Sequence, residues 1–318
     1  MRESTSARGP LPRATGVVDS LSAGFGVVNE QPWIVLIPIL LDLFFLFGPR
    51  VSIAPVIGQI VTRPELSRAL GADSTSAALA LAEETNLLGL LSPAGMTLPT
   101  IVPALASRVG GARGAFIMVD SVAAAFLVGL GAVLIGAFLG CLYRVILSQQ
   151  AREGELTLRS LPAESVVAWG RVIALTLLLT FVGFFAIVPL AFIAALASLA
   201  TAAATAIMTA IVATVAIAAQ LYLFFAPDAI FISRVGPIQA IRQSAAVVHA
   251  GIWSALTLAI LITVILIGMS QVWIALAGQA SWGLALGIVG NAYVASGLVA
   301  ASMLFYRERM ENLLAQRS

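Results

Sequence analysis

The stretch that decides the fold is residues 172–227, which reads VIALTLLLTFVGFFAIVPLAFIAALASLATAAATAIMTAIVATVAIAAQLYLFFAP. Its 56 residues include no Asp, Glu, Lys, Arg or His. As one helix it would be about 84 Å long at 1.5 Å per residue, far more than the roughly 30 Å of a bilayer's hydrocarbon core. The chain must therefore turn back within it, and we place the turn at 198–201, between two membrane-spanning helices.

A second stretch, residues 251–306, is also 56 residues long and free of charge, and its turn is predicted at 278–281. Over the full 318 residues, 60% are hydrophobic and only 10% are charged. A soluble domain carries about 25% charged residues. The composition therefore excludes a soluble globular protein and indicates an integral membrane protein.

Further apolar runs predict an all-α fold, a polytopic transmembrane helical bundle of about six spans. We expect residues 1–30 to form a basic tail and an interfacial amphipathic helix, 31–49 the first transmembrane span, and 50–117 a small external helical cap. Residues 118–318 are expected to form a five-span bundle with cytoplasmic connectors. Its spans are predicted at 118–142, 167–197, 202–226, 251–276 and 282–305.

The placement of arginine predicts the orientation. All 17 basic residues are arginine, and those outside the long 50–117 loop, apart from Arg171, lie in the two terminal segments and in the connectors 144–164 and 227–250. The short loops near 199 and 279 carry no charge. Because cytoplasmic loops are enriched in Arg and Lys, we expect both termini in the cytoplasm of a bacterium, with the chain in its cytoplasmic membrane.

An internal repeat is a further hypothesis. At an offset of 81 residues, 166–177 aligns with 247–258 with seven of twelve positions identical, and the two predicted turns then coincide. The alternative is chance similarity between Ala-, Leu- and Val-rich segments. If the repeat is real it is parallel, and repeat interfaces in transporters often contain binding sites.

Polar residues within the spans give a candidate intramembrane polar site, composed of Asp42, Asn291 and Arg171. A carboxylate at membrane depth costs a few kcal/mol on insertion scales, so such residues are rare and face the bundle interior. Asp42 either lies on a proton or ion pathway or is a structural carboxyl, hydrogen-bonded to Asn291, Tyr293 or Thr180. Arg171 is near the inner start of its span, where it can extend to the interface.

The connector at 227–250 is a candidate docking site for a partner. Apolar residues at 238, 241, 245 and 248 share one helical face, which predicts a helix lying in the inner interface. The polar residues of the connector that could dock a cytoplasmic partner are Arg234, Gln239, Arg242 and Gln243.

Small residues recur at four-residue spacing at Gly136 and Gly140 and at Gly283 and Gly287. This pattern lets helix backbones approach closely. It predicts helix packing within one bundle or between copies in a homo-oligomer.

No residue pattern points to catalysis or to a cofactor. Cys141 is the only cysteine and His249 the only histidine, so an internal disulfide and a multi-histidine metal site are excluded. No Walker A loop, nucleophile elbow, zinc-protease motif or dinucleotide fingerprint is present. We expect no enzymatic activity, no cofactor, no metal and no nucleic-acid partner.

Two segments resemble known membrane proteins. Residues 29–50, which include Pro32, Trp33 and Asp42, are similar to the opening of an uncharacterised bacterial multi-pass family. Residues 224–244, beginning FFAPDAI, resemble the connector in the membrane domain attached to some glycerophosphoryl diester phosphodiesterases. The catalytic barrel of those enzymes has no counterpart here, so the resemblance implies a membrane-anchoring or lipid-proximal role and no phosphodiesterase activity.

Two functional classes follow. The leading expectation is a non-enzymatic scaffold or accessory subunit, with membrane lipids and a membrane or cytoplasmic protein as partners. The alternative is a small-solute or lipid transporter that uses the repeat interface and Asp42. An intramembrane enzyme ranks third.

Overall fold

The computed structural model describes residues 16–92, 98–105, 115–154, 156–279 and 281–316. These residues are almost entirely helical, so the expectation of an all-α polytopic bundle is confirmed. Five helices are long and apolar enough to cross a membrane: Val122–Arg152, Leu161–Leu196, Ala202–Ile232, Ile252–Ala277 and Trp282–Ala315. The chain has the architecture of a multi-pass membrane protein.

Two helical hairpins dominate the second half of the chain. The first joins α8 (Leu161–Ala200) to α9 (Ala202–Leu223), and the second joins α12 (Ile252–Ala277) to α13 (Ser281–Ala315). Thr201 ends the first turn by accepting a hydrogen bond from the Ala204 N–H. The short helices α10 (Ala226–Ile232) and α11 (Pro237–Ala250) connect the two hairpins. The two units differ, because α8 is continuous whereas α11 and α12 are separate helices that meet at Gly251.

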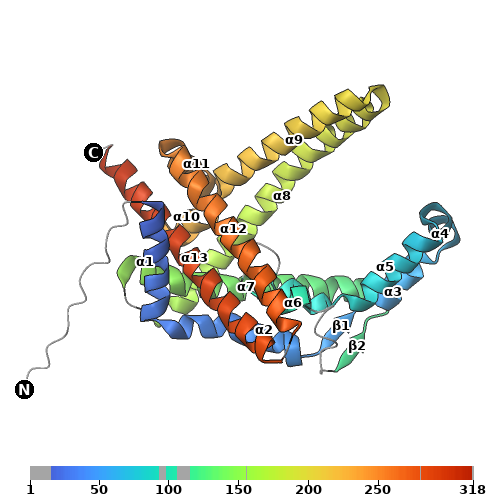
Figure 1. The fold of residues 1–318 in the computed structure, drawn as a ribbon, viewed down its shortest axis with the longest axis horizontal. Helices are drawn as coiled ribbons and strands as arrows, with labels where there is room; N and C mark the ends of the chain where they lie inside the picture. The colour runs from blue at the N-terminus through green and yellow to red at the C-terminus, as the bar shows by residue number, and fades with distance from the viewer. Residues whose placement is uncertain (1–15, 93–97, 106–114, 155, 280, 317–318) are drawn as a thin grey trace, which may run out of the picture.

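The centre of the bundle is α13, which crosses α7 (Val122–Glu153) at an angle (Figure 1). The Tyr143 hydroxyl of α7 donates to Ser296 Oγ at 2.7 Å, and further along Arg307 donates to the Ala151 carbonyl. Tyr143 and Ser296 are both fully buried. These contacts place the carboxyl ends of α7 and α13 at the same end of the bundle.

The first helix, α1 (Val17–Glu30), packs along α13 in the opposite direction. At its carboxyl end Asn29 accepts a hydrogen bond from the Tyr293 hydroxyl, and nearer its start Gly24 lies against Gly297 and Ala301. A Cβ at Gly24 would lie only 2.5 Å from the Gly297 carbonyl oxygen. The structure therefore differs from the expected interfacial helix, because this glycine lets α1 join the bundle.

The segment expected to form a straight first span, 31–49, is short and bent. It consists of η1 (Pro32–Val35) and α2 (Leu36–Phe47), and together they turn by 91° from α1. The bend falls at Gln31, ahead of a proline that begins the new helix, the position where proline fits best. At about 18 Å, α2 alone is shorter than the roughly 30 Å core of a bilayer. The α1–α2 pair is a broken span or a re-entrant loop, and it would be the sixth span if the pair crosses as one.

The region expected to be a helical cap contains strands as well as helices. Strand β1 (Arg50–Ser52) pairs in parallel with β2 (Phe116–Met118). The helices between them, of which α3 and α5 extend away from the bundle (Figure 1), are α3 (Ala54–Val61), α4 (Pro64–Leu70), α5 (Ala72–Glu84), η2 (Leu87–Leu91) and α6 (Val102–Leu105). Each strand is three residues long, too short for the alternating pattern that reveals a strand in a sequence.

The two small-residue motifs pack different partners. Gly283 and Gly287 lie against α12, where Gly283 meets the Leu276 carbonyl, so this motif closes the second hairpin. Gly136 of α7 meets the Leu91 carbonyl of η2, so the first motif admits a short 3-10 helix of the cap.

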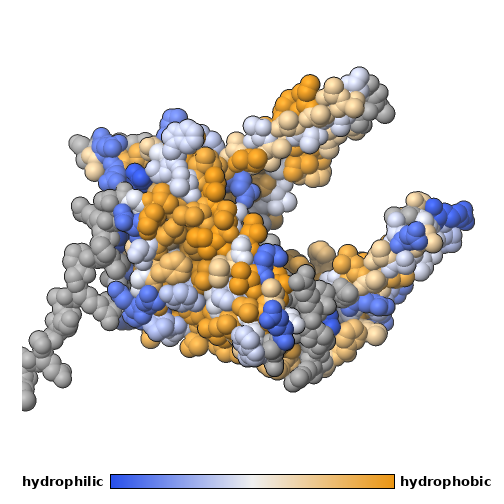
Figure 2. Space-filling view, in the orientation of Figure 1, coloured by the Kyte–Doolittle hydropathy of each residue, from blue (hydrophilic) through white to orange (hydrophobic). Residues whose placement is uncertain are grey.

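The first hairpin is the most exposed part of the bundle. No described residue of α9 is buried, and none of α8 is buried beyond Leu175. Apolar residues cover the hairpin as it projects from the bundle (Figure 2). In a bilayer this surface faces lipid tails.

Candidate functional site

A cavity of about 780 Å³ is lined by residues of the α8–α9 hairpin and of α12 and α13. The hairpin diverges from α12 and α13 in Figure 1. Small-molecule sites in proteins typically measure about 300–1,000 Å³. The apolar lining comes from both hairpins and includes Leu175, Leu179, Ala216, Ala219, Leu223, Ile262, Leu266, Ala295, Leu298 and Val299. The cavity thus lies between the two units that the 81-residue offset aligns.

An ion pair lines the cavity. Arg144 of α7 and Asp228 of α10 are the two charged residues among the described lining, with Arg144 Nη1 3.8 Å from Asp228 Oδ1. The other carboxylate oxygen, Oδ2, accepts a hydrogen bond from Ser302 of α13. Arg144 is 8% exposed and Asp228 is 3% exposed. Three different helices therefore meet at one buried pair of opposite charges.

The arginine of this pair is incompletely satisfied. Its guanidinium lies 5.8 Å from the centre of the Phe231 ring, and its Nε has no hydrogen-bond partner among the described residues. At 3.8 Å the contact with Asp228 is an ion pair but is longer than a hydrogen bond. A guanidinium has five N–H donors, so Arg144 can bind further acceptor atoms from the cavity.

Neutral polar groups also line the cavity: Thr100, Gln220, Thr263 and Asn291. Asn291 donates a hydrogen bond to the Pro99 carbonyl at 3.3 Å, which holds the 98–100 segment at the cavity. Asn291 is therefore placed at a candidate site, as the sequence suggested, but with different neighbours.

Asp42 is buried outside this cavity. Its Oδ1 accepts hydrogen bonds from the backbone N–H groups of Ile101 and Val102, both at 3.0 Å, and its Oδ2 lies 3.2 Å from the Ile101 nitrogen. The carboxyl caps the start of α6 and ties the 98–105 segment to α2. Asn291, Tyr293 and Thr180, which we considered as partners, do not bond Asp42; the backbone N–H groups at the start of α6 take that place.

Arg171 lies away from both Asp42 and Asn291. It is half-buried and lines a smaller cavity of about 240 Å³ with Glu164 and Arg234, at the junction of α7, α8 and α10. The structure therefore does not bring the three predicted polar residues together into one site.

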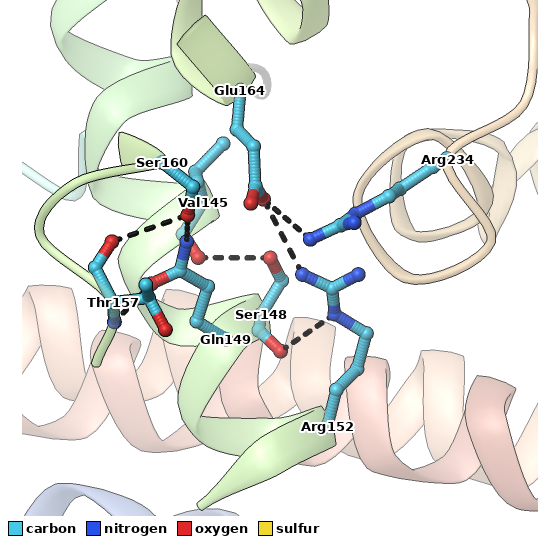
Figure 3. A network of polar contacts seen from close by, with 8 residues as sticks. All are labelled: Val145, Ser148, Gln149, Arg152, Thr157, Ser160, Glu164 and Arg234. Atoms are coloured by element: carbon cyan, nitrogen blue, oxygen red, sulfur yellow. Dashed lines mark hydrogen bonds and ion pairs between the residues drawn. The ribbon is translucent and has the colours of Figure 1, made fainter. Parts of the chain in front are cut away.

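A polar network organises that junction (Figure 3). Glu164 Oε2 lies 2.8 Å from Arg234 and 3.4 Å from Arg152, between the two guanidinium groups. Gln149 accepts a hydrogen bond from the Thr157 N–H and donates one to Ser160. Since these residues come from α7, the start of α8 and the α10–α11 turn, the network fixes the base of the first hairpin.

The predicted docking connector is only partly available to a partner. Arg234 pairs with Glu164, and Gln243 accepts a hydrogen bond from the Tyr306 hydroxyl at 2.9 Å. Gln239 and Arg242 are exposed. The buried face of α11 is also different from the expected one, because it consists of Ala240, Ser244, Val247 and Val248.

Sequence reasoning missed the ion pair of the cavity. Arg144 follows the predicted second span and Asp228 follows the charge-free run at 172–227, and neither was named as a candidate site residue. The available signal was the pairing of opposite charges at the same predicted membrane level. Helix tilt and the break at α10 draw both residues into the bundle. A charged side chain at a span boundary would otherwise extend to water.

Among the described residues, no group of three His, Cys, Asp or Glu side chains is placed to hold a metal ion. No protein-family model, no curated protein and no solved structure matches the chain. The resemblance to phosphodiesterase membrane domains therefore stays a prediction.

Proposed function

We propose that this protein is a membrane transporter that binds a lipid or an amphiphilic small molecule between its two hairpins. The observation that carries the proposal is the Arg144–Asp228 pair, which is buried yet lines a cavity. Charged side chains at membrane depth are costly and mark substrate or ion pathways. The lipid-proximal role implied by the resemblance to phosphodiesterase membrane domains agrees with this proposal.

A purely structural ion pair is a weaker account of these two residues. A buried pair offsets its desolvation only when its geometry is close and its remaining donors are filled. Here the closest contact is 3.8 Å and Arg144 Nε lacks a partner among the described groups. Asp42 has no part in the proposal, because backbone N–H groups occupy its oxygens.

A matched pair of variants tests the proposal. Ala219 lines the cavity, whereas its neighbour Ala218 is exposed on α9 outside the lining. We expect purified wild-type protein to retain a defined small molecule or lipid in mass spectrometry, Ala219→Trp to lose it, and Ala218→Trp to keep it. Equal retention by the two variants, or no selective retention by the wild type, contradicts the proposal.

We also propose that the chain lies in a bacterial cytoplasmic membrane with both termini in the cytoplasm. The arginine distribution supports this orientation, and so does the antiparallel packing of α1 on α13. In a Cys141→Ala background, an impermeant maleimide added to intact cells should label Gln279→Cys, and it should label Gln316→Cys only after permeabilisation. The reverse pattern contradicts the orientation.

A scaffold or accessory subunit is the second candidate. A groove of about 670 Å³ lies between α11 and the carboxyl end of α13, lined by Gln239, Arg242 and exposed apolar residues such as Ile238 and Leu314. If this function holds, a stoichiometric protein partner should co-purify and be lost in Arg242→Glu. Neither candidate is an enzyme, and the residues lining the large cavity include no histidine, cysteine or glutamate.

A further inference from the structure

The charges of the cavity lining restrict its ligand. Among the residues that the structure describes, Arg144 and Asp228 are the charged ones that line it, so this part of the lining carries one positive and one negative group. The other described polar lining groups are neutral hydroxyls and amides such as Thr100 and Gln220. The charges of the described lining therefore sum to zero before a ligand enters.

A ligand with a net charge would disturb this balance. An anion bound to Arg144 would leave Asp228 without its counter-charge, and a cation bound to Asp228 would leave Arg144 unpaired. An uncompensated charge in a buried site is strongly unfavourable. A zwitterion avoids both outcomes, because it supplies one charge of each sign and the sum remains zero.

The geometry of the pair suits insertion of a zwitterion. The two groups are 3.8 Å apart without a hydrogen bond between them, so separating them breaks no short contact. Asp228 is held by Ser302 through Oδ2, which leaves Oδ1, the oxygen nearest Arg144, for an ammonium N–H. Arg144 retains unfilled donors for an oxyanion, and its guanidinium is steadied by the Phe231 ring.

The walls add an apolar requirement. Leucine, isoleucine and alanine side chains from α8, α9 and α12 contribute seven of the lining residues, and further apolar residues come from α10, α13 and the 98–99 segment. Apolar surface favours a ligand whose body is hydrophobic, at roughly 25 cal/mol per Å² buried. The cavity thus combines one pair of opposite charges with a largely apolar lining.

We propose that the cavity recognises an amphipathic zwitterion, with an ammonium group on Asp228, a phosphate or carboxylate on Arg144, and a hydrophobic body along the two hairpins. This inference rests on the proposed binding function of the cavity and adds the class of ligand. The same chemistry is found in an aminophospholipid headgroup and in a free hydrophobic amino acid.

The test uses the full-length protein in nanodiscs and isothermal titration. The probes are short-chain phosphatidylethanolamine, phosphatidylglycerol with the same acyl chains, and free leucine. We expect the wild type to bind phosphatidylethanolamine or leucine at least about tenfold more tightly than phosphatidylglycerol, because an anion leaves Asp228 uncompensated. Binding of phosphatidylethanolamine alone identifies a lipid source, and binding of leucine alone identifies a solute.

The decisive variant is one that should change which probe the protein prefers. In Asp228→Asn the amide can still accept from Ser302, but the site becomes positive, so phosphatidylglycerol should become the preferred probe. Arg144→Gln with Asp228→Asn should bind the zwitterion and the anion equally, and it keeps the inference testable if the single variant does not fold. Misfolding could abolish the binding of every probe, but it could not reverse which probe binds more tightly.

Two results overturn the inference. One is wild-type binding of phosphatidylglycerol as tight as that of phosphatidylethanolamine and leucine, and the other is an unchanged order of affinity in Asp228→Asn. If none of the three probes binds while the Ala219→Trp comparison shows selective retention, the zwitterion is wrong and the binding function stands. If the Ala219→Trp comparison shows no difference, the binding function itself is wrong.

Discussion

Replacement of Asp42 separates a structural carboxyl from one on an ion pathway. The backbone nitrogens of Ile101 and Val102 lie 3.0 Å from Asp42 Oδ1. In Asp42→Asn the amide oxygen can occupy the Oδ1 position and keep both contacts, with a neutral acceptor in place of a carboxylate. In Asp42→Leu both buried N–H groups lose their partner.

The magnitudes follow from these contacts. A hydrogen bond to a charged group is worth about 1.5–3 kcal/mol and one between neutral groups about 0.5–1.5 kcal/mol, so weakening two bonds costs roughly 1–3 kcal/mol in Asp42→Asn. An orphaned buried donor costs about 1–3 kcal/mol, so Asp42→Leu should cost roughly 2–6 kcal/mol. These free energies apply to the detachment of the 98–105 segment, whose helix α6 the Asp42 carboxyl caps, from α2.

Amide hydrogen exchange in nanodiscs measures this local opening. Exchange at Ile101 and Val102 should accelerate about tenfold in Asp42→Asn and at least about thirtyfold in Asp42→Leu, since about 1.4 kcal/mol corresponds to a factor of ten. Ligand retention by the cavity should survive Asp42→Asn. Unchanged exchange together with lost retention would refute the structural role and return Asp42 to an ion pathway.

Three further predictions concern packing and the hairpin base. Gly24→Ala should displace α1 from α13 and lower the melting temperature by an overpacking cost of about 1–3 kcal/mol, whereas Gly26→Ala, with open space around it, should not. Gly136→Ala should expose the cap to proteolysis while Gly131→Ala leaves it protected, so equal protection in the two variants contradicts the packing. Glu164→Gln should speed exchange in the α10–α11 turn with a loss of stability near 1 kcal/mol or less, because the pair is partly exposed; unchanged exchange there would exclude a clamping role.

The spans were predictable because the bilayer imposes a simple length rule. The charge-free runs at 172–227 and 251–306 are each too long for one crossing and too short for three, so each predicts a hairpin. The structure has a turn within each predicted position, at Thr201 and at Gly278. Composition and length alone were sufficient for this part of the fold.

The candidate site was less predictable because it depends on how helices tilt and bend. Arg144 and Asp228 are 84 positions apart in the chain, and nothing local relates them. Asp42 was recognised as a buried carboxyl, but its partners are backbone N–H groups, which every residue except proline carries, so no residue type marks them. A glycine lowers helix propensity, so nothing in the sequence marks Gly24 as a packing residue, whereas the close approach of α1 to α13 requires it.

Because the α8–α9 hairpin is exposed, the surrounding lipid takes the place of a protein packing partner for it. Because no residue of α9 is buried within the chain, the protein itself supplies little force that fixes the tilt of this hairpin. Acyl chains must supply that lateral pressure, and the width of the adjoining cavity then depends on the thickness and composition of the bilayer. Detergent replaces these chains with a shorter and softer shell. The affinity of the cavity for its ligand should therefore change step by step from micelles to bilayers of increasing thickness.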